Sequence, residues 1–354
     1  MTRRRATRAE GDEGRAGSRA PGIARLALVP AALLFRVAVA ARGALYEAGA
    51  LRPRRVAVPV ISVGNLTVGG TGKTPLVIWI AQRLLEIGVQ PGILLRGYGA
   101  RRGRAPRLVS GAAPAALARE SDEAILLAAR LPGVPVVAGR DRVRGAALAI
   151  AAGARALVLD DGFQHRALAR DLDLLLLDPR FPPPRSALLP AGPFREPWPA
   201  ARRAHLLLAV DAPAMPSPNG RPILRAERRA SALRLAGARL APDALAGRRV
   251  ALLSGIARPD AFRSLIARLG ATVVTEARFP DHHRFRNGEP ERALAEARAA
   301  AADLVVTTEK DAARLPRSLL DRADVGVLEI AIHFPEGDAP LLSAIRETVG
   351  ARAR

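Results

Sequence analysis

The sequence predicts an α/β fold: a P-loop-containing parallel sheet covered by helices, a second, smaller α/β lobe and an N-terminal membrane-associated helix. Three observations support this prediction. Short apolar segments that suit buried strands alternate with segments of helical periodicity. The glycine-rich turn Gly69-Gly70-Thr71-Gly72-Lys73-Thr74 separates the first such strand from its helix. A proline-rich and polar region divides the alternating elements into two groups, so we expect two lobes.

Composition limits the classes of protein to consider. The chain has 354 residues, of which 49% are hydrophobic, enough for two sizeable cores. It has no cysteine, which excludes disulfides, thiolate metal sites and a thiol nucleophile. The net charge of +22 favours an anionic partner such as nucleic acid, phospholipid headgroups or a phosphorylated substrate. Aromatic residues make up only 3% and arginines are spread along the chain, which argues against nucleic acid.

The N-terminal region favours contact with a membrane. Residues 1–20 are predicted to be a disordered basic tail. Residues 21–52 are predicted to form an interfacial amphipathic helix, apolar but interrupted by Arg25, Arg36 and Arg42. Its longest apolar run, 26–35, is shorter than the roughly 20 residues that span a bilayer, so we expect it to lie at the surface. A cleaved signal peptide and a plain buried helix are the alternatives.

The glycine-rich turn has the context of a P-loop. Residues 58–63 are predicted to form a buried strand, 64–65 a turn and 75–87 a helix. In a P-loop, backbone N–H groups surround a nucleotide phosphate, the lysine reaches the β- and γ-phosphates, and the hydroxyl binds Mg²⁺. The alternative is an ordinary glycine-rich connection. The residues expected to contact a nucleotide are Thr67, Val68, Gly69, Gly70, Thr71, Gly72, Lys73 and Thr74.

Lysine usage supports the phosphate interpretation. Of 55 basic residues only two are lysines, Lys73 and Lys310. A compact ammonium suits the narrow space around a phosphate better than the planar fork of arginine. Thr67 stands where the general motif has its first glycine, so the loop is a variant form.

The remaining elements fill the two lobes. Residues 53–212 are assigned to the first lobe, 213–334 to the second, and 335–354 to a final helix whose placement the sequence leaves open. Residues 178–200 are rich in proline and predicted to be a long loop. Further strands are expected at 91–95, 134–138, 156–159, 174–177, 249–254, 272–275, 304–307 and 325–332, and further helices at 121–130, 142–152, 260–269 and 289–301.

Two acidic pairs stand where ligands bind. Asp160 and Asp161 end a strand downstream of the glycine-rich turn, where a carboxylate can hold Mg²⁺, although aspartate is also common in turns. Asp122 and Glu123 follow Ser121. A serine N-cap with acids in the first turn is typical of a helix start, and a base for a sugar or alcohol hydroxyl is the functional alternative. Both interpretations can hold together.

The second lobe carries two polar groups of interest. Asp281-His282-His283 has no spacing that suits zinc, so an Asp–His pair with acid–base function is favoured over a metal site. A solvated polar loop is the alternative. Lys310 follows a predicted strand, next to a helix start at Thr308 or Asp311, and its spacing assigns it no role.

Taken together, these segments resemble the tetraacyldisaccharide 4′-kinase family, the lipid A 4′-kinases of Gram-negative bacteria. The resemblance covers nearly the whole chain, from about residue 23 to 334. It rests on the order of seven motifs: Val63-Gly64-Asn65-Leu66-Thr67-Val68-Gly69-Gly70-Thr71-Gly72-Lys73-Thr74-Pro75, Arg96-Gly97-Tyr98-Gly99, Asp122-Glu123, Asp160-Asp161-Gly162-Phe163-Gln164-His165, Leu189-Pro190-Ala191-Gly192-Pro193, Asp281-His282-His283 and Thr308-Glu309-Lys310-Asp311.

This resemblance implies an activity and its cofactors. The enzyme would transfer the γ-phosphate of ATP, with Mg²⁺, to the 4′-hydroxyl of tetraacyldisaccharide 1-phosphate, forming lipid IVA. It would work on the cytoplasmic face of the inner membrane as a peripheral or monotopic protein. Its partners would be the anionic glycolipid substrate and the membrane surface, with no nucleic acid and no obligate protein partner.

The resemblance also implies residue roles, with the nucleotide between a P-loop kinase lobe and the smaller lobe. Asp122 would be the catalytic base and His282 its partner, while Lys73 contacts the phosphates. Thr74, Asp160, Asp161 and Glu123 would lie on the Mg²⁺ side. The proline-rich loop would be a lid or a lipid-facing element.

A second class of protein would share part of this site. A membrane-associated P-loop ATPase that acts as a switch would need Lys73, Thr74 and Asp160, but it would have no use for a pair made by Asp122 and His282.

Overall fold

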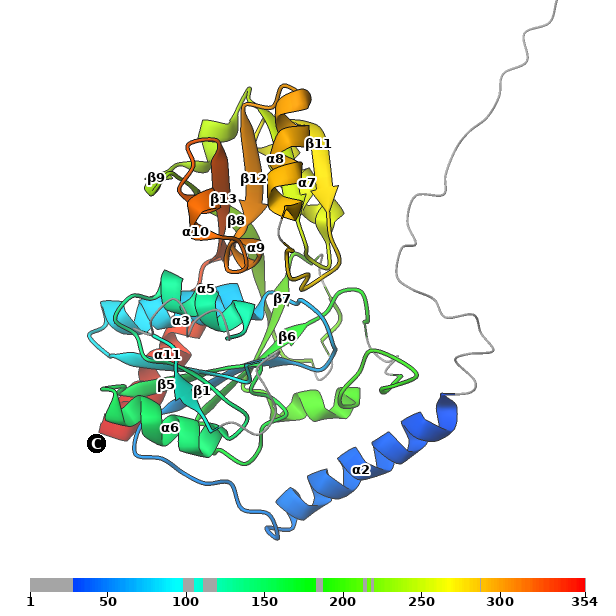
Figure 1. Cartoon of the computed structure of the whole chain (residues 1–354). Helices are drawn as coiled ribbons and strands as arrows, with labels where there is room; N and C mark the ends of the chain where they lie inside the picture. The colour runs from blue at the N-terminus through cyan, green and yellow to red at the C-terminus, as the bar shows by residue number, and fades with distance from the viewer. Residues whose placement is uncertain are drawn as a thin grey trace, which may run out of the picture.

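The protein consists of two lobes, seen one above the other in the computed structural model of Figure 1. The structure describes residues 28–97, 105–110, 120–182, 187–212, 215–217, 220–286 and 288–353. The predicted tail at 1–20 and the residues Tyr98 and Gly99 lie outside this part of the chain. The mixed α/β architecture predicted from the sequence is confirmed.

The first lobe is a parallel sheet. Its strands pair in the order β7-β6-β1-β5-β2-β4, with the short β3 antiparallel at the edge. Most of the strands are buried along their whole length, which is why they read as continuous apolar runs. Their bounds are β1 Val60–Asn65, β2 Pro91–Leu95, β3 Arg107–Leu108, β4 Val136–Ala138, β5 Ala156–Asp160, β6 Leu172–Leu177 and β7 Leu206–Val210.

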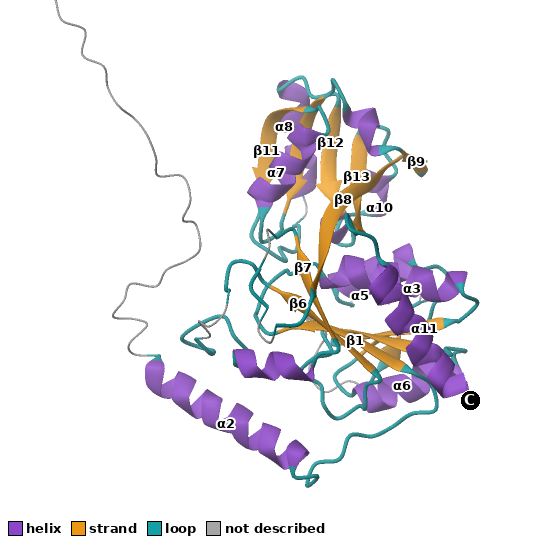
Figure 2. Cartoon of the chain, turned by 180° about the vertical axis from the view of Figure 1, so that it is seen from behind, coloured by secondary structure: helices purple, strands orange, loops and turns teal. Residues whose placement is uncertain are grey.

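Helices cover both faces of this sheet (Figures 1 and 2). On one face lie α3 (Lys73–Glu86), α5 (Asp122–Arg130) and the C-terminal α11 (Ala339–Ala353), and on the other lies α6 (Arg142–Ala151). Leu341 and Ile345 of α11 are fully buried in the core of the first lobe. The final helix, whose placement the sequence left open, therefore returns to the first lobe.

A single long strand, β8 (Ile223–Leu235), joins the two lobes. Its first residues pair in parallel with β7, and the rest pair antiparallel with β13 (Val325–His333). The second-lobe strands follow in the order β13-β12-β10-β11, so the described strands form one continuous sheet. Neither β7 nor β8 was predicted. The sequence of β8 carries arginines in place of an apolar run, because much of the strand is only half-buried.

The remaining elements complete the second lobe. They are β9 Ala238–Leu240, β10 Arg249–Ser254, α7 Pro259–Arg268, β11 Thr272–Arg278, α8 Glu289–Ala299, β12 Leu304–Thr308, α9 Glu309–Ala312 and α10 Arg317–Leu320, with a 3₁₀ turn at Pro242–Leu245. Their apolar residues form cores on both faces of the second-lobe sheet. The expected βα order of this lobe is confirmed.

The N-terminal helix α2 (Val29–Glu47) lies beside the first lobe and buries none of its residues (Figure 1). The buried-helix alternative is therefore wrong. At 19 residues the helix is long and apolar enough to cross a membrane by length and composition. The inference that it is too short to span is also wrong, because the helix continues through Arg36 and Arg42 beyond the apolar run.

The proline-rich segment is irregular, as predicted, but its described part is packed in the core. Phe194 and Trp198 are buried against Leu175 and Leu177 of β6, and a 3₁₀ helix follows at Trp198–Arg203. Phe194 also forms a β-bridge with Thr67, just ahead of the glycine-rich turn. This segment thus packs against the residues that precede the glycine-rich turn. The predicted turn at 64–65 is wrong, because both residues belong to β1.

Removing the Phe194 ring should destabilise the first lobe. Because the side chain is fully buried, Phe194→Ala is expected to lower the free energy of unfolding by about 3–5 kcal/mol. Urea denaturation followed by circular dichroism measures this. Phe181→Ala, a half-buried ring that contacts Phe194 edge-on, is the matched control and should cost less than half as much. Equal losses would contradict the assignment of Phe194 to the core.

Candidate active site

The glycine-rich turn has the geometry of an anion cradle. Gly69 and Gly72 have φ of 112° and 86°, a conformation that side chains with a Cβ rarely adopt. Lys73 is the first residue of the 14-residue α3, so the N–H groups at the positive end of this helix point into the turn. Thr67 is buried, and its hydroxyl donates to Asp178 Oδ2 at 3.2 Å. Thr67 therefore anchors the turn through its side chain.

Lys73 is held between two groups at the ends of neighbouring strands. Its Nζ donates to Asn65 Oδ1 at 3.1 Å and lies 3.4 Å from Asp161 Oδ1. Asn65 ends β1 and is fully buried. Sequence reasoning missed it because it was assigned to a turn.

Asp160 and Asp161 lie beside the turn, at the end of β5. Asp160 Oδ2 accepts a hydrogen bond from the Thr74 hydroxyl at 3.3 Å. Burial raises the pKa of Asp160 to about 6. Asp161 has φ of 57° and pairs with Arg195 Nη1 at 2.6 Å. Burial works to raise the pKa of Asp161 too, but the Lys73 and Arg195 cations outweigh it and the pKa is lowered.

These oxygen donors suit Mg²⁺. Thr74 and Asp160 offer a hydroxyl and a carboxylate in contact, and the charge of Glu123 is near enough to help raise the pKa of Asp160. No group of three or more His, Cys, Asp or Glu side chains within the described residues is arranged to hold a metal. A hard cation that keeps water and takes phosphate oxygens fits such a sparse donor set.

Asp122 faces the second lobe across a cleft. The Ser121 hydroxyl caps α5 by accepting from Ala124 N, so the capping interpretation holds for Ser121. Asp122 Oδ2 lies 2.9 Å from His282 Nδ1 and 3.4 Å from Arg314 Nε. His282 has φ of 58° and donates its backbone N–H to Gly255 O. The structure thus brings together two residues that are 160 positions apart.

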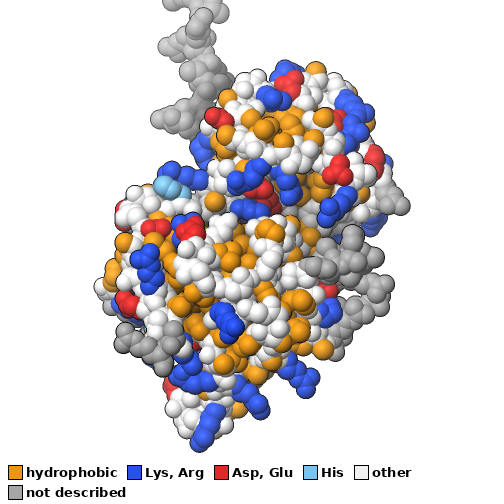
Figure 3. All heavy atoms as spheres, turned by 90° about the vertical axis from the view of Figure 1, so that its left-hand side faces the viewer, with side chains coloured by type: hydrophobic (Ala, Val, Ile, Leu, Met, Phe, Trp, Pro, Cys, Tyr) orange, Lys and Arg blue, Asp and Glu red, His pale blue; other side chains and the backbone are white. Residues whose placement is uncertain are grey.

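More charged pairs cross the same cleft. Lys310 Nζ lies 3.7 Å from Glu123 Oε1, which gives the second lysine a partner that its spacing did not reveal. At the other end of α5, Arg130 donates to Glu309 Oε1 at 2.6 Å. Thr308 caps α9, as the helix-start alternative expected. Figure 3 shows basic and acidic side chains gathered at the junction between the lobes.

His283 has a different role from its neighbour. Its Nε2 lies 2.7 Å from Glu289 Oε2, and its ring stacks on Phe279 at 4.9 Å. Glu289 Oε2 also accepts from Arg286 N. These contacts hold the loop that carries His282.

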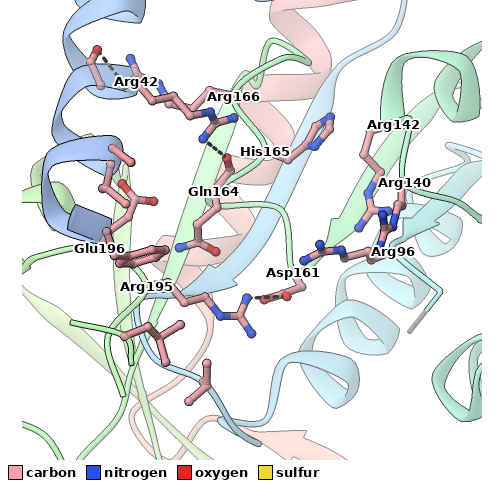
Figure 4. Close-up of a pocket in the computed structure, with 16 residues that line it drawn as sticks. Arg42, Arg96, Arg140, Arg142, Asp161, Gln164, His165, Arg166, Arg195 and Glu196 are labelled. Carbon is pink, nitrogen blue, oxygen red and sulfur yellow. Dashed lines mark hydrogen bonds and ion pairs between the residues drawn. The ribbon is translucent and has the colours of Figure 1, made fainter. Parts of the chain in front are cut away.

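A cavity of about 600 Å³ opens between α2 and the first lobe. One side is apolar, formed by Phe35, Ala38 and Val39 of α2. Figure 4 shows Arg96, Arg140 and Arg142 on one side, Arg42 and Arg166 on another, and the Arg195–Asp161 pair between them. Six arginines line the cavity in all: Arg42, Arg96, Arg140, Arg142, Arg166 and Arg195.

His165 adds a neutral group to the same cavity. Burial, with Arg142 and Arg170 nearby, lowers its pKa to about 4, so the ring is uncharged near neutral pH. The cavity can therefore receive a ligand with both an anionic and an apolar part. Asp161, which lines the cavity, also contacts Lys73. Sequence reasoning named Arg42 and Arg96 for other reasons and missed the other four arginines, because arginine is the usual cation everywhere in this chain.

Comparison with known proteins identifies a family. The family model for tetraacyldisaccharide-1-P 4′-kinase matches residues 24–349. A tetraacyldisaccharide 4′-kinase of Anaeromyxobacter sp. (strain Fw109-5) is 49% identical over 353 residues, covering 91% of this chain and 94% of the relative. One from Syntrophus aciditrophicus (strain SB) is 38% identical, covering 80% and 82%.

A solved structure extends the similarity to three dimensions. LpxK from Aquifex aeolicus, an "apo" form crystallised in complex with ATP, superposes with a TM-score of 0.75 at 32% identity. The match covers 92% of this chain and 99% of that one. By sequence and fold, this chain belongs to the tetraacyldisaccharide-1-P 4′-kinase family.

Proposed function

We propose that this chain is an ATP-dependent lipid kinase that phosphorylates the 4′-hydroxyl of tetraacyldisaccharide 1-phosphate, forming lipid IVA for lipid A biosynthesis. One observation supports the proposal: Glu123, the neighbour of Asp122, is close enough to raise the pKa of Asp160, which accepts a hydrogen bond from Thr74 in the glycine-rich turn. Membership of the family and the ATP-bound relative support the same donor and acceptor.

The donor half is the glycine-rich turn. The N–H groups at the start of α3 and the Lys73 ammonium hold the β- and γ-phosphates of ATP. When ATP binds, the Lys73 ammonium exchanges its ion pair with Asp161 for contacts with the phosphates. The Asp161 carboxylate keeps its ion pair with Arg195. Thr74, Asp160, Asp161 and Glu123 are the residues that would hold Mg²⁺, which would neutralise phosphate charge.

The acceptor half is the Asp122–His282 pair. Asp122 takes the proton of the attacking hydroxyl, because a carboxylate positioned by two neighbours is a suitable general base. His282 fixes the carboxylate through Oδ2. Phosphoryl transfer needs positioning and charge neutralisation more than covalent help, and this cleft supplies both.

The arginine-lined cavity is the proposed entrance for the glycolipid. Its arginines suit an anionic headgroup, and the α2 side suits acyl chains. Leu34 and Val37 of α2 are 73% and 65% exposed, which favours contact with lipid. We place the protein at the cytoplasmic face of the inner membrane, where ATP is available.

A product assay tests the proposed reaction. Purified protein, ATP-Mg²⁺ and tetraacyldisaccharide 1-phosphate should yield a bisphosphorylated lipid, detected by mass spectrometry. ATP hydrolysis without this product would favour the ATPase switch instead. The Lys73→Ala variant is the negative control, since it lacks the phosphate contact.

Asp122→Asn should lower kcat by about 100-fold or more, because an amide cannot accept the hydroxyl proton. ATP binding should be nearly unchanged, as measured by isothermal titration calorimetry. Asp243→Asn, an exposed aspartate in the 3₁₀ turn of the second lobe, is a matched control. Wild-type turnover in the Asp122 variant would leave the residue with no role beyond the start of α5.

Adding charge to α2 should weaken membrane contact. The double variant Leu34→Glu, Val37→Glu places two acids on exposed apolar positions and should lose most binding to vesicles that contain anionic phospholipid. Co-sedimentation measures the bound fraction. Leu85→Glu, at a position in α3 that is 40% exposed, is the control and should bind normally. Equal binding of all three proteins would rule out α2 as the contact.

A further inference from the structure

We infer that Arg314 is a positioning residue for phosphoryl transfer: it holds the Asp122 carboxylate and the His282 loop in their working arrangement. The inference deepens the proposed kinase function and rests on it. Arg314 follows α9 in the second lobe, and its side chain is only 7% exposed. Sequence reasoning did not select it from the many arginines.

The Arg314 guanidinium joins three segments of the second lobe. Nη1 donates to His283 O at 2.7 Å, next to His282. Nη2 donates to Gly255 O, at the end of β10, at 3.1 Å, and to Asp311 Oδ1 at 2.5 Å. A planar group with five N–H donors can make these bonds at once, which a lysine ammonium could not do in the same directions.

Asp311, in the interior of the second lobe, holds the Arg314 guanidinium in place. Its side chain is fully buried, and it accepts from the Thr308 hydroxyl at 2.7 Å and from Gly255 N at 3.0 Å. Burial raises the pKa of this carboxyl against the effect of its hydrogen bonds and of Arg314. With both carboxylate oxygens occupied inside the lobe, the guanidinium has one defined orientation.

The Nε atom of Arg314 lies where the two lobes meet, and its N–H donates to Lys310 O at 3.3 Å. Nε lies 3.4 Å from Asp122 Oδ2, the same oxygen that His282 Nδ1 contacts at 2.9 Å. Both neighbours therefore contact Oδ2, and we assign Oδ1 to the proton of a substrate hydroxyl. A residue that only stabilised the second lobe would need no contact with α5 of the first.

The loop geometry depends on the same side chain. His282 has φ of 58° and is held there by its N–H bond to Gly255 O. Arg314 donates to that same carbonyl and to the carbonyl of the next residue, His283. Loss of the fork would release the segment that presents the imidazole to Asp122.

Kinetics of two substitutions test this role. Arg314→Gln should lower kcat by about 10- to 100-fold through misplacement of the base, while KM for ATP changes by less than about threefold. Arg314→Lys keeps the charge but not the fork and should recover only a small part of the activity. Arg322→Gln removes an ion pair with Asp324, outside the cleft, and is the control expected to keep wild-type kcat. Thermal melting of each variant verifies the fold.

A double-mutant cycle separates positioning from general stabilisation. If Arg314 acts through Asp122, the double variant Asp122→Asn, Arg314→Gln should turn over within about twofold of Asp122→Asn alone. Multiplied losses, or full activity in Arg314→Gln or Arg314→Lys, would overturn the inference. Should Arg314→Gln fail to fold, the same cycle with Arg314→Lys gives the answer. No lipid product from the wild-type protein would instead count against the proposed function.

Discussion

The parallel pairing of β1 with β5 is the constraint on which the site depends. Val63 of β1 lies opposite Asp160 of β5, so the glycine-rich turn and the two aspartates leave the sheet side by side. Gly64 permits this closeness, because a Cβ there would lie 2.5 Å from the Cβ of Phe163. The burial that raises the pKa of Asp160 and the cations that lower that of Asp161 follow from this arrangement.

The second half of the site depends on the other lobe. Asp122 belongs to α5, yet its contacts come from His282 and Arg314 across the cleft. Lys310–Glu123 and Arg130–Glu309 extend the same interface along α5. The phosphate cradle and the proposed base therefore both belong to the first lobe, while the groups that hold the base come from the second, so the lobes must keep a defined relation.

The sequence predicted what local pattern and motif can carry. Continuous apolar runs located most strands of both lobes, and the glycine-rich turn lies between β1 and α3, as predicted. Such patterns cannot predict contacts between residues that are distant in the chain. Nothing in the spacing places Lys310 near Glu123 or Arg314 near Asp122. The arginines of the cavity could not be selected from the sequence, because arginine is abundant and nothing distinguishes them from the other arginines in the chain. β8 escaped because a half-buried strand at a junction keeps polar side chains.

The return of α11 to the first lobe affects the order in which the two lobes can finish folding. The chain leaves the first lobe along β8 and comes back only after β13, so the second lobe is an insertion within the first. On the ribosome, Leu341 and Ile345 emerge after the entire second lobe. The first-lobe core that α11 covers therefore stays open to solvent until this helix has been made, whereas α2 is made before either lobe.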